Sequence, residues 1–300
     1  MSMGKSIAKS KIARGKILFY VCIVALPLLQ FAIFYIGVNV NSFVLAFQEW
    51  DGELGVHKWH GIENFKQVIN DFFNDGQVKI AMKNSLLLFV IGVLLGTTLA
   101  LLFSYYIYKK QFGSRFFKTV LFMPNVVSSV TLSIMLLYFT TDATNAIFGI
   151  ELLTDTRTKL PTLIFISILL SFGVQVLIYS GAMSGISESV SEAAVLDGIT
   201  PLKELIYIDV PMIFPTISVF IVSSIAGIFL NQMNVFNMYG AGAPDVSIYT
   251  IGYYLYTKIL GATTSEFPYF AAFGLVLTFI TVPVAFLTRY LLNKFGPSVE

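Results

Sequence analysis

The chain has 300 residues, of which 56% are hydrophobic and only 12% are charged, and its formal net charge is +2. A soluble domain carries about 25% charged residues, so the composition excludes an ordinary water-soluble protein and indicates an integral membrane protein. The near-neutral charge and the scattered basic residues argue against nucleic acid as a partner. The single cysteine excludes an intramolecular disulfide.

Six uncharged runs are long enough to cross a bilayer, which requires about 20 apolar residues in a helix. We interpret the first run as a retained helix, because it is too long for a signal peptide and no small-residue cleavage site soon follows it. The predicted fold class is an all-α membrane protein with six transmembrane helices. Residues 1–16 are expected to form a cytoplasmic tail and residues 17–300 the transmembrane domain. The runs are 17–48, 84–108, 119–141, 160–187, 210–244 and 267–288.

The distribution of Lys and Arg predicts the orientation, because these residues are enriched in cytoplasmic loops. Five basic residues precede the first run, and four more follow the second run between Lys109 and Lys118. An even number of spans places both termini on the same side. Both termini and the polar segment 188–211 are therefore predicted to be cytoplasmic.

This polar segment reads ESVSEAAVLDGITPLKELIYIDVP and predicts two short helices. Ser189-x-x-Glu192 is a capping-box pattern that predicts a helix starting near Val190. The segment carries more Asp and Glu than Lys, whereas a loop resting on anionic lipid would favour basic residues. We therefore expect a protein partner, with an ordinary headgroup-facing loop as the alternative.

The join between the two helices is also predicted from local signals. Gly198 suits the left-handed position that ends a helix. Thr200 is expected to cap the second helix, with Pro201 at its first position. Pro211 is expected to end that helix, whose apolar side would include Leu202, Leu205, Ile206 and Ile208.

Glu192-Ala193-Ala194-x-x-Asp197-Gly198, followed by Ile208 and Pro211, resembles the EAA loop of ABC importer permeases. The sequence departs from the family pattern at Ile199, where Ala is usual, and at Leu205, where Phe is usual. The resemblance implies that the segment is a coupling helix that docks into a groove of a cytosolic ATPase. The residues to which it assigns this coupling role are Glu192, Ala193, Ala194, Asp197, Gly198, Leu205, Ile208 and Pro211.

Three further motifs resemble the carbohydrate branch of this family, the maltose-type and glycerol-phosphate-type subunits: GIENF at 61–65, FMPNVVS at 122–128, and NQMNVF at 231–236 leading to GAP at 242–244. The resemblance implies a multi-pass protein of the bacterial cell membrane. It implies a second EAA-type permease subunit, two cytosolic ATPases that bind ATP and Mg²⁺, an extracellular or periplasmic solute-binding protein, and a sugar. The chain itself would hold no cofactor.

The end of the fifth run is the candidate substrate site. Amides hydrogen-bond hydroxyl groups, and aromatic faces stack on the apolar side of a sugar ring. No charge accompanies the cluster, so a neutral sugar is favoured over a phosphate, although the amides could instead bond backbone carbonyls or a neighbouring helix. Gln175 and Asn125 are interpreted as contacts between helices. The cluster comprises Asn231, Gln232, Asn234, Phe236, Asn237 and Tyr239.

Two other transport functions stay open on sequence alone: a stand-alone secondary transporter, and an ABC permease for a non-sugar solute such as glycerol-3-phosphate. A secondary transporter would need buried charges for ion coupling, and the uncharged runs argue against them. His57 and His60 lack the spacing of a metal site. With no arrangement of catalytic residues at a plausible depth, an enzyme is not expected.

Overall fold

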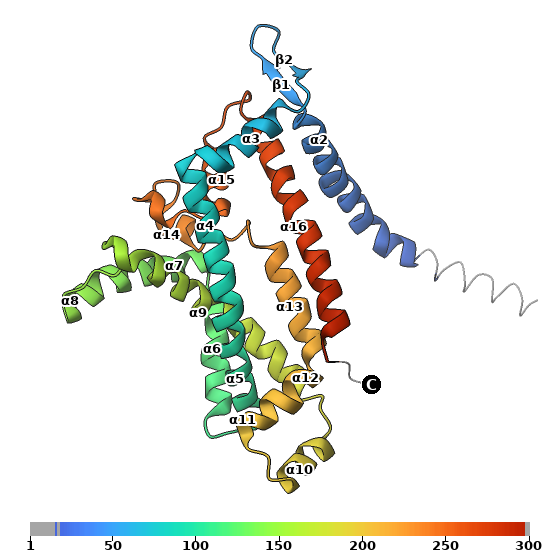
Figure 1. Cartoon of the computed structure of the whole chain (residues 1–300), viewed down its shortest axis with the longest axis vertical. Coiled ribbons are helices and arrows are strands. Elements are labelled where there is room, and N and C mark those ends of the chain that lie inside the picture. Colours follow the sequence, from blue (N-terminus) through green and yellow to red (C-terminus); the bar gives the residue numbers. More distant parts are fainter. Residues whose placement is uncertain (1–15, 17–18, 298–300) are drawn as a thin grey trace, which may run out of the picture. The chain divides into compact units, whose positions relative to one another are not determined.

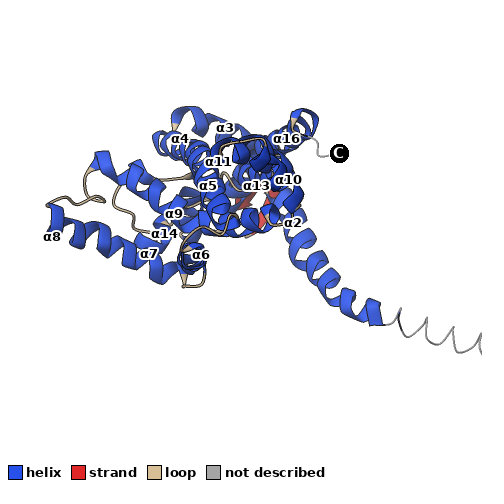
Figure 2. Cartoon of the chain, turned by 90° about the horizontal axis from the view of Figure 1, so that it is seen from below, coloured by secondary structure: helices blue, strands red, loops and turns tan. Residues whose placement is uncertain are grey.

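The computed structural model describes residues 16 and 19–297. The predicted cytoplasmic tail therefore lies, except for Lys16, outside the described residues. The described chain is almost entirely helical (Figure 2), as the predicted fold class requires. It divides into two compact units, the described part of residues 1–68 with 262–276, and residues 69–261 with 277–300.

The first unit contains a long helix, Phe19–Leu45, whose second half comprises η1 (Phe31–Gly37) and α2 (Val38–Leu45). A short antiparallel hairpin of β1 (Gln48–Asp51) and β2 (Val56–Trp59) follows, with Gln48 opposite Trp59. The hairpin was not predicted. Asn64, from the GIENF motif, is buried and donates to the carbonyl oxygens of Ala46 and Gln48 at 3.0 and 2.8 Å. The motif thus fixes the start of α3 (Glu63–Asn74) against the base of the hairpin.

The second unit holds the remaining helices, which Figure 1 colours from cyan to orange. Several continue directly into the next: α4, η2 and α5 form one helix, Gly76–Tyr108. In chain order the elements are α4 (Gly76–Ile91), η2 (Gly92–Gly96), α5 (Thr97–Tyr108), α6 (Ser114–Phe122), η3 (Met123–Asn125), α7 (Ser129–Tyr138), η4 (Phe139–Ala143), α8 (Thr144–Phe148), α9 (Thr156–Met183), α10 (Glu188–Leu196), α11 (Pro201–Glu204), η5 (Leu205–Asp209), α12 (Val210–Met212), α13 (Phe214–Ala226), α14 (Val235–Tyr239), η6 (Val246–Ile248), α15 (Ile251–Leu260) and, crossing from the first unit, α16 (Phe267–Phe295).

Among the described residues, four continuous helices are long and apolar enough to cross a membrane: Phe19–Leu45, Gly76–Tyr108, Thr156–Met183 and Phe267–Phe295. The number rises to six if each of two bent helix pairs forms one span. The third and fifth spans are not single straight helices, because these pairs bend by 99° and 74°. Pro124 and the extended backbone of Ser128 interrupt the third span, and Ile213, followed by Pro215, interrupts the fifth.

The fifth apolar run is also not helical as far as residue 244. Helix α13 ends at Ala226, and a turn region precedes the five-residue helix α14. Met233 and Asn234 both have positive φ angles, 53° and 57°. The Asn231 side chain accepts a hydrogen bond from the Met233 backbone N–H at 2.8 Å. Side-chain amides that bond nearby backbone groups compete with the helical pattern, so the polar cluster favours the non-helical stretch between α13 and α14.

Direct polar contacts hold the second unit's helices together. The Ser104 hydroxyl on α5 bonds the carbonyl oxygen of Val176 on α9 at 3.0 Å. Asn84 on α4 donates to the carbonyl oxygens of Ser247 and Tyr249 at 2.7 and 2.8 Å, which fixes η6 beside α4. Buried serine and asparagine side chains therefore define which helix faces meet.

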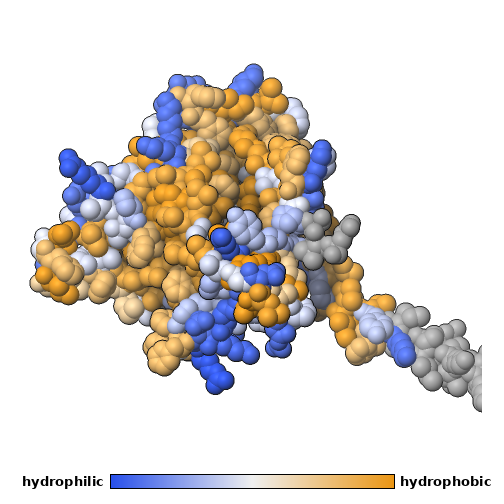
Figure 3. Space-filling view, turned by 60° about the horizontal axis from the view of Figure 1, so that its bottom comes forward, coloured by the Kyte–Doolittle hydropathy of each residue, from blue (hydrophilic) through white to orange (hydrophobic). Residues whose placement is uncertain are grey.

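Large apolar side chains are widely exposed on both units, for example Phe34 in the first unit and Leu94 in the second. The face drawn in Figure 3 is mostly hydrophobic, with hydrophilic side chains in separate groups. Water-soluble proteins rarely expose contiguous apolar patches of more than a few hundred Å². Such a surface fits a chain that is surrounded by lipid.

Candidate functional site

The EAA-like segment begins with α10, which starts at Glu188 rather than near Val190. Ser187 occupies the capping position with an extended backbone, and its side chain makes no capping bond. The hydroxyls of Ser187 and Ser189 instead hydrogen-bond each other at 3.0 Å. The capping-box prediction was therefore wrong: Ser189 already lies inside the helix.

The end of α10 agrees with the prediction. Gly198 has a φ of +69°. The Ile199 N–H donates to the Ala194 carbonyl, and the Gly198 N–H donates to the Val195 carbonyl, both at 3.1 Å. This bond pair is a Schellman motif, which requires a residue in the left-handed conformation. Gly198 thus sets the direction in which the chain leaves the first helix.

The second helix begins as predicted, with Thr200 before it and Pro201 in its first turn, but no bond from the Thr200 side chain caps it. Pro211 does not end it. Helical turns continue through η5 and α12 to Met212. Pro211 lies one residue before the end of this continuous helix, Pro201–Met212.

Exposure divides the coupling candidates into two groups. Glu192, Ala193, Asp197 and Gly198 are exposed. Ala194 and Leu205 are buried, so neither side chain is part of the exposed surface of the segment. Ile208 and Pro211 are partly buried. The exposed apolar side chains of the segment are Val195, Leu196, Leu202, Ile206 and Tyr207, and Leu196 is 88% exposed.

The segment is attached to the end of α5 by a compact polar cluster. Lys109 Nζ lies 2.6 Å from Glu204 Oε1 on α11 and 2.6 Å from Ser191 Oγ on α10. The Ser191 hydroxyl donates to Glu204 Oε1 at 2.9 Å, and the Tyr105 hydroxyl donates to Glu204 Oε2 at 2.8 Å. A hollow of about 770 Å³ lies beside this cluster, lined by residues from α10 and from the chain around Lys109.

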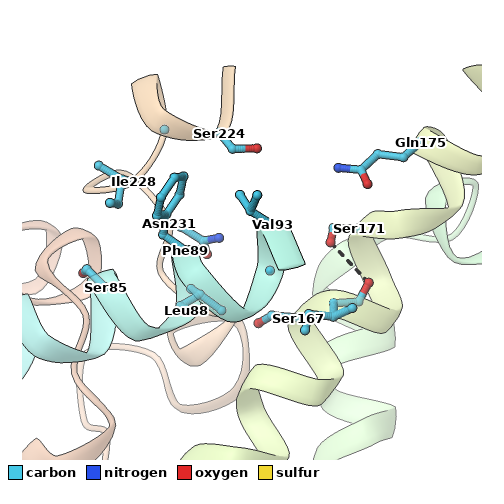
Figure 4. Close-up of a pocket in the computed structure, with 13 residues that line it drawn as sticks. Ser85, Leu88, Phe89, Val93, Ser167, Ser171, Gln175, Ser224, Ile228 and Asn231 are labelled. Carbon is cyan, nitrogen blue, oxygen red and sulfur yellow. Dashed lines mark hydrogen bonds between the residues drawn. The ribbon is translucent and has the colours of Figure 1, made fainter. Parts of the chain in front are cut away.

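A second cavity, of about 220 Å³, lies between α4, α9 and the end of α13. Figure 4 shows Gln175 and Ser224 extending toward the same open space. The lining residues, all described, include no Asp, Glu, Lys, Arg or His. The buried Gln175 Oε1 and Ser167 Oγ have no hydrogen-bond partner within the described chain. The polar lining residues are Ser85, Ser167, Ser171, Gln175, Ser224 and Asn231.

Of the six predicted substrate residues, Asn231 lines this cavity. Phe236 packs edge-to-face on Tyr256 with ring centroids 4.7 Å apart. Phe236 and Tyr239 both pack against the buried apolar core that includes Met233 and Val235. Asn237 donates to Asn234 Oδ1 at 3.3 Å, and Gln232 is partly buried. The structure therefore brings one member of the predicted cluster to the cavity and places the others within or against the fold.

Gln175 and the serines around it were not predicted as substrate residues. A signal was present in the sequence, because Ser167, Ser171 and Gln175 follow one another at intervals of four. Residues with this spacing lie on one face of a helix. Ser85 could not be found this way, since it is one polar residue in an apolar run and also accepts a hydrogen bond from the Ile251 backbone N–H.

The EAA-like segment (residues 188–211, the coupling segment) and most of the residues that line the cavity lie within the part of the chain that matches a known family, whereas Ser85 and Leu88 precede that part. The model of the binding-protein-dependent transport system inner membrane component family matches residues 89–298. The chain belongs to this family. It is an inner-membrane permease of an ABC importer, which rules out the stand-alone secondary transporter that the sequence left open.

Several curated proteins are similar to this chain over most of their length, and two of the three that follow are named as transport permeases. The sn-glycerol-3-phosphate transport system permease protein UgpA of Shigella dysenteriae serotype 1 (strain Sd197) is 23% identical over 281 residues, which cover 91% of this chain and 93% of that protein. Protein LplB of Bacillus subtilis (strain 168) is 25% identical and covers 98% of this chain and 94% of its own length. The probable ABC transporter permease protein YurN of the same strain is 26% identical, with 91% and 94% covered.

A solved structure shares the fold. A chain from the crystal structure of a bacterial ABC transporter involved in the import of the acidic polysaccharide alginate has a TM-score of 0.77 at 19% identity, covering 96% of this chain and 98% of that one. The same type of transporter, in complex with an alginate pentasaccharide-bound periplasmic protein, gives a TM-score of 0.75. The resemblance to ABC importer permeases, first seen in the EAA-like segment, is confirmed at the level of family and fold.

Proposed function

We propose that this permease carries a neutral sugar or oligosaccharide. The observation that carries the proposal is the chemistry of the 220 Å³ cavity, whose polar groups are hydroxyls and amides without a charged side chain. Hydroxyl and amide groups both donate and accept hydrogen bonds, as the hydroxyls of a sugar require. Gln175 Oε1 and Ser167 Oγ are buried and lack partners within the described protein, so a ligand or a partner chain would have to supply them.

The cavity would hold only part of an oligosaccharide. Its volume of about 220 Å³ is below the range of about 300–1,000 Å³ that is usual for pockets enclosing a drug-sized ligand. We infer that a second EAA-type permease supplies the other wall. Asn231 would then be the member of the predicted amide cluster that touches the sugar, while Phe236 and Tyr239 support the chain around it.

The same proposal assigns the coupling segment to an ATPase. Glu192, Ala193, Asp197 and the exposed apolar residues around Leu196 form a small surface on the unit that also holds the cavity. Two cytosolic ATPases would bind ATP and Mg²⁺ and drive the motion, one of them through this surface. A solute-binding protein would deliver the sugar, and the chain itself would carry out no catalysis.

Glycerol-3-phosphate is the second candidate, because the relatives named above include permeases for that solute. A phosphate is normally held by Arg, Lys or a cluster of backbone N–H groups. No Lys or Arg lines the cavity. The uncharged lining therefore favours the neutral sugar.

The test is uptake by the complete transporter in liposomes. The chain is co-expressed with its second permease, ATPases and binding protein, and radiolabelled neutral oligosaccharides are compared with labelled glycerol-3-phosphate. We expect uptake of a neutral sugar that depends on ATP and on the binding protein. Uptake of glycerol-3-phosphate together with no uptake of any neutral sugar would reject the proposal.

A further inference from the structure

The strongest polar cluster outside the cavity is the one that joins Lys109 to Glu204. The Glu204 side chain is only 7% exposed and the Lys109 side chain 20% exposed. Asp209, a second buried carboxylate, lies within electrostatic range of both. Removing one partner of a buried ion pair leaves an uncompensated charge, so such pairs hold their elements together firmly once formed.

The cluster joins elements that the chain connects only by a long path. Glu204 is on α11 and Ser191 on α10, in the coupling segment, whereas Tyr105 and Lys109 are at the end of α5. The coupling segment is linked directly along the chain to α9 and α13. Through Lys109 it gains a non-covalent attachment to α5, about 80 residues earlier in the sequence.

Helix α5 leads from this attachment to the cavity. It continues α4 and η2, and the cavity is lined by Ser85, Leu88, Phe89, Gly92 and Val93 of that same helix. At about 1.5 Å per residue, Val93 and Lys109 are separated by about 24 Å of helix. Val93 itself lies in the π-helical segment Gly92–Gly96. Interruptions of this kind often mark functional positions within helices.

We propose that the Lys109–Glu204 ion pair transmits the motion of the coupling segment to α5, and so to the cavity wall formed by residues 85–93. This inference rests on the proposed function and adds to it a positioning residue, Lys109, and a route. Tyr105 and Ser191 position the carboxylate: their hydroxyls bond its two oxygens and leave Lys109 as its cationic partner. Displacement of α11 and α10 then pulls the end of α5 with them.

The inference is tested in the assembled transporter, with sugar uptake and ATP hydrolysis measured on the same preparations. Lys109→Met and Glu204→Gln are compared with Lys109→Arg, which keeps the charge. Lys110→Met is the matched control, because Lys110 is the adjacent lysine, is exposed, and lies next to the same hollow. Coupling between sites typically amounts to about 5- to 150-fold.

We expect Lys109→Met and Glu204→Gln to assemble with the ATPases and hydrolyse ATP, but to transport at least about tenfold less sugar per ATP. Lys109→Arg and Lys110→Met should retain the wild-type ratio. A purely structural role would lower uptake and ATP hydrolysis together and leave their ratio unchanged. An unchanged ratio in Lys109→Met would overturn the inference.

If the single variants fail to assemble, the charge-exchanged protein Lys109→Glu/Glu204→Lys decides. Recovery of both assembly and the transport ratio supports the inference, whereas recovery of assembly alone, or no recovery, rejects it. The wild-type transporter is measured first. Failure of the wild type to take up any neutral sugar counts against the proposed substrate and not against the ion pair. The ratio of transport to ATP hydrolysis is then measured with the solute that the wild type does carry.

Discussion

Gln175 illustrates how a single residue can indicate a ligand. Its Oε1 is buried and has no partner within the described chain, while Ser171, one turn earlier on the same face, satisfies its own hydroxyl by bonding the Ile168 carbonyl at 3.2 Å. Leaving a buried acceptor unpaired costs about 1–3 kcal/mol. In the assembled transporter a bound sugar would offset that cost if one of its hydroxyls reached Gln175.

Gln175→Ala and Asn231→Ala should each weaken sugar transport. A sugar hydroxyl that loses its amide partner costs about 1–3 kcal/mol, roughly ten- to a hundred-fold in affinity. The ATPases should still co-purify, because neither residue belongs to the coupling segment. Uptake is measured over a range of sugar concentrations, and Gln111→Ala, which removes an exposed amide from the loop after α5, is the control. Wild-type uptake by both cavity variants with every transported sugar would place the substrate elsewhere.

Gly198 matters because of its left-handed backbone conformation and not because of a side chain. At a φ of +69°, a β-branched residue is strained, by about 1–2 kcal/mol. Gly198→Val should therefore redirect the second helix of the coupling segment and abolish uptake, while membrane insertion stays normal. Gly198→Asn should retain uptake, because Asn tolerates the left-handed region. Membrane fractionation and uptake are compared, and normal uptake in the Val variant would remove the segment from the coupling role.

At the scale of whole elements, the approach of α6 to α9 depends on a missing side chain. A Cβ at Gly173 would lie 2.1 Å from the Leu121 carbonyl oxygen on α6, and about 3.0 Å from the Asn125 side-chain nitrogen. A backbone atom cannot move aside as a flexible side chain can. Helices that meet at a small residue are therefore held at a fixed separation.

Gly173→Ala should lower the thermal stability of the protein in detergent. Forcing additional atoms into a packed contact costs about 1–3 kcal/mol. Gly181→Ala is the matched control, because Gly181 lies on the same helix and a Cβ there would meet nothing within 4 Å. The two unfolding temperatures are compared with that of the wild type. Equal temperatures for Gly173→Ala and the wild type would contradict the close approach.

Local signals account for the elements that the sequence predicted well. Gly198 and Pro201 specify a turn and a helix start through their own backbone preferences, so both were visible without the fold. The breaks at Ser128 and Ile213 were missed although Pro124 and Pro215 lie beside them, because apolar residues on both sides continue the hydrophobic run. The cavity depends on which face of α9 meets α4, and that is decided by packing. The four-residue spacing of Ser167, Ser171 and Gln175 was the accessible clue.

At the scale of the whole molecule, the surface implies that the chain does not work alone. Glu192 and Asp197, which belong to the proposed coupling surface, are exposed, and Leu196 beside them is 88% exposed. The cavity is smaller than a typical enclosed ligand site. Its lining residues, including those with unpaired polar atoms, all belong to this chain. A surface for an ATPase and an incomplete cavity together point to an assembly.

Transport should therefore require every predicted partner. Liposomes that contain this chain alone should show no uptake, because an exposed coupling surface without an ATPase has no source of energy and half a cavity cannot hold the sugar. Adding the ATPases without the second permease should also fail, whereas the full set with the binding protein should transport. Each combination is measured with and without ATP, and Glu192→Lys is added to the full set. That variant should reduce ATPase co-purification by placing a cation on the coupling surface. Uptake by the purified chain alone would contradict the assembly and show that a single subunit transports the sugar by itself.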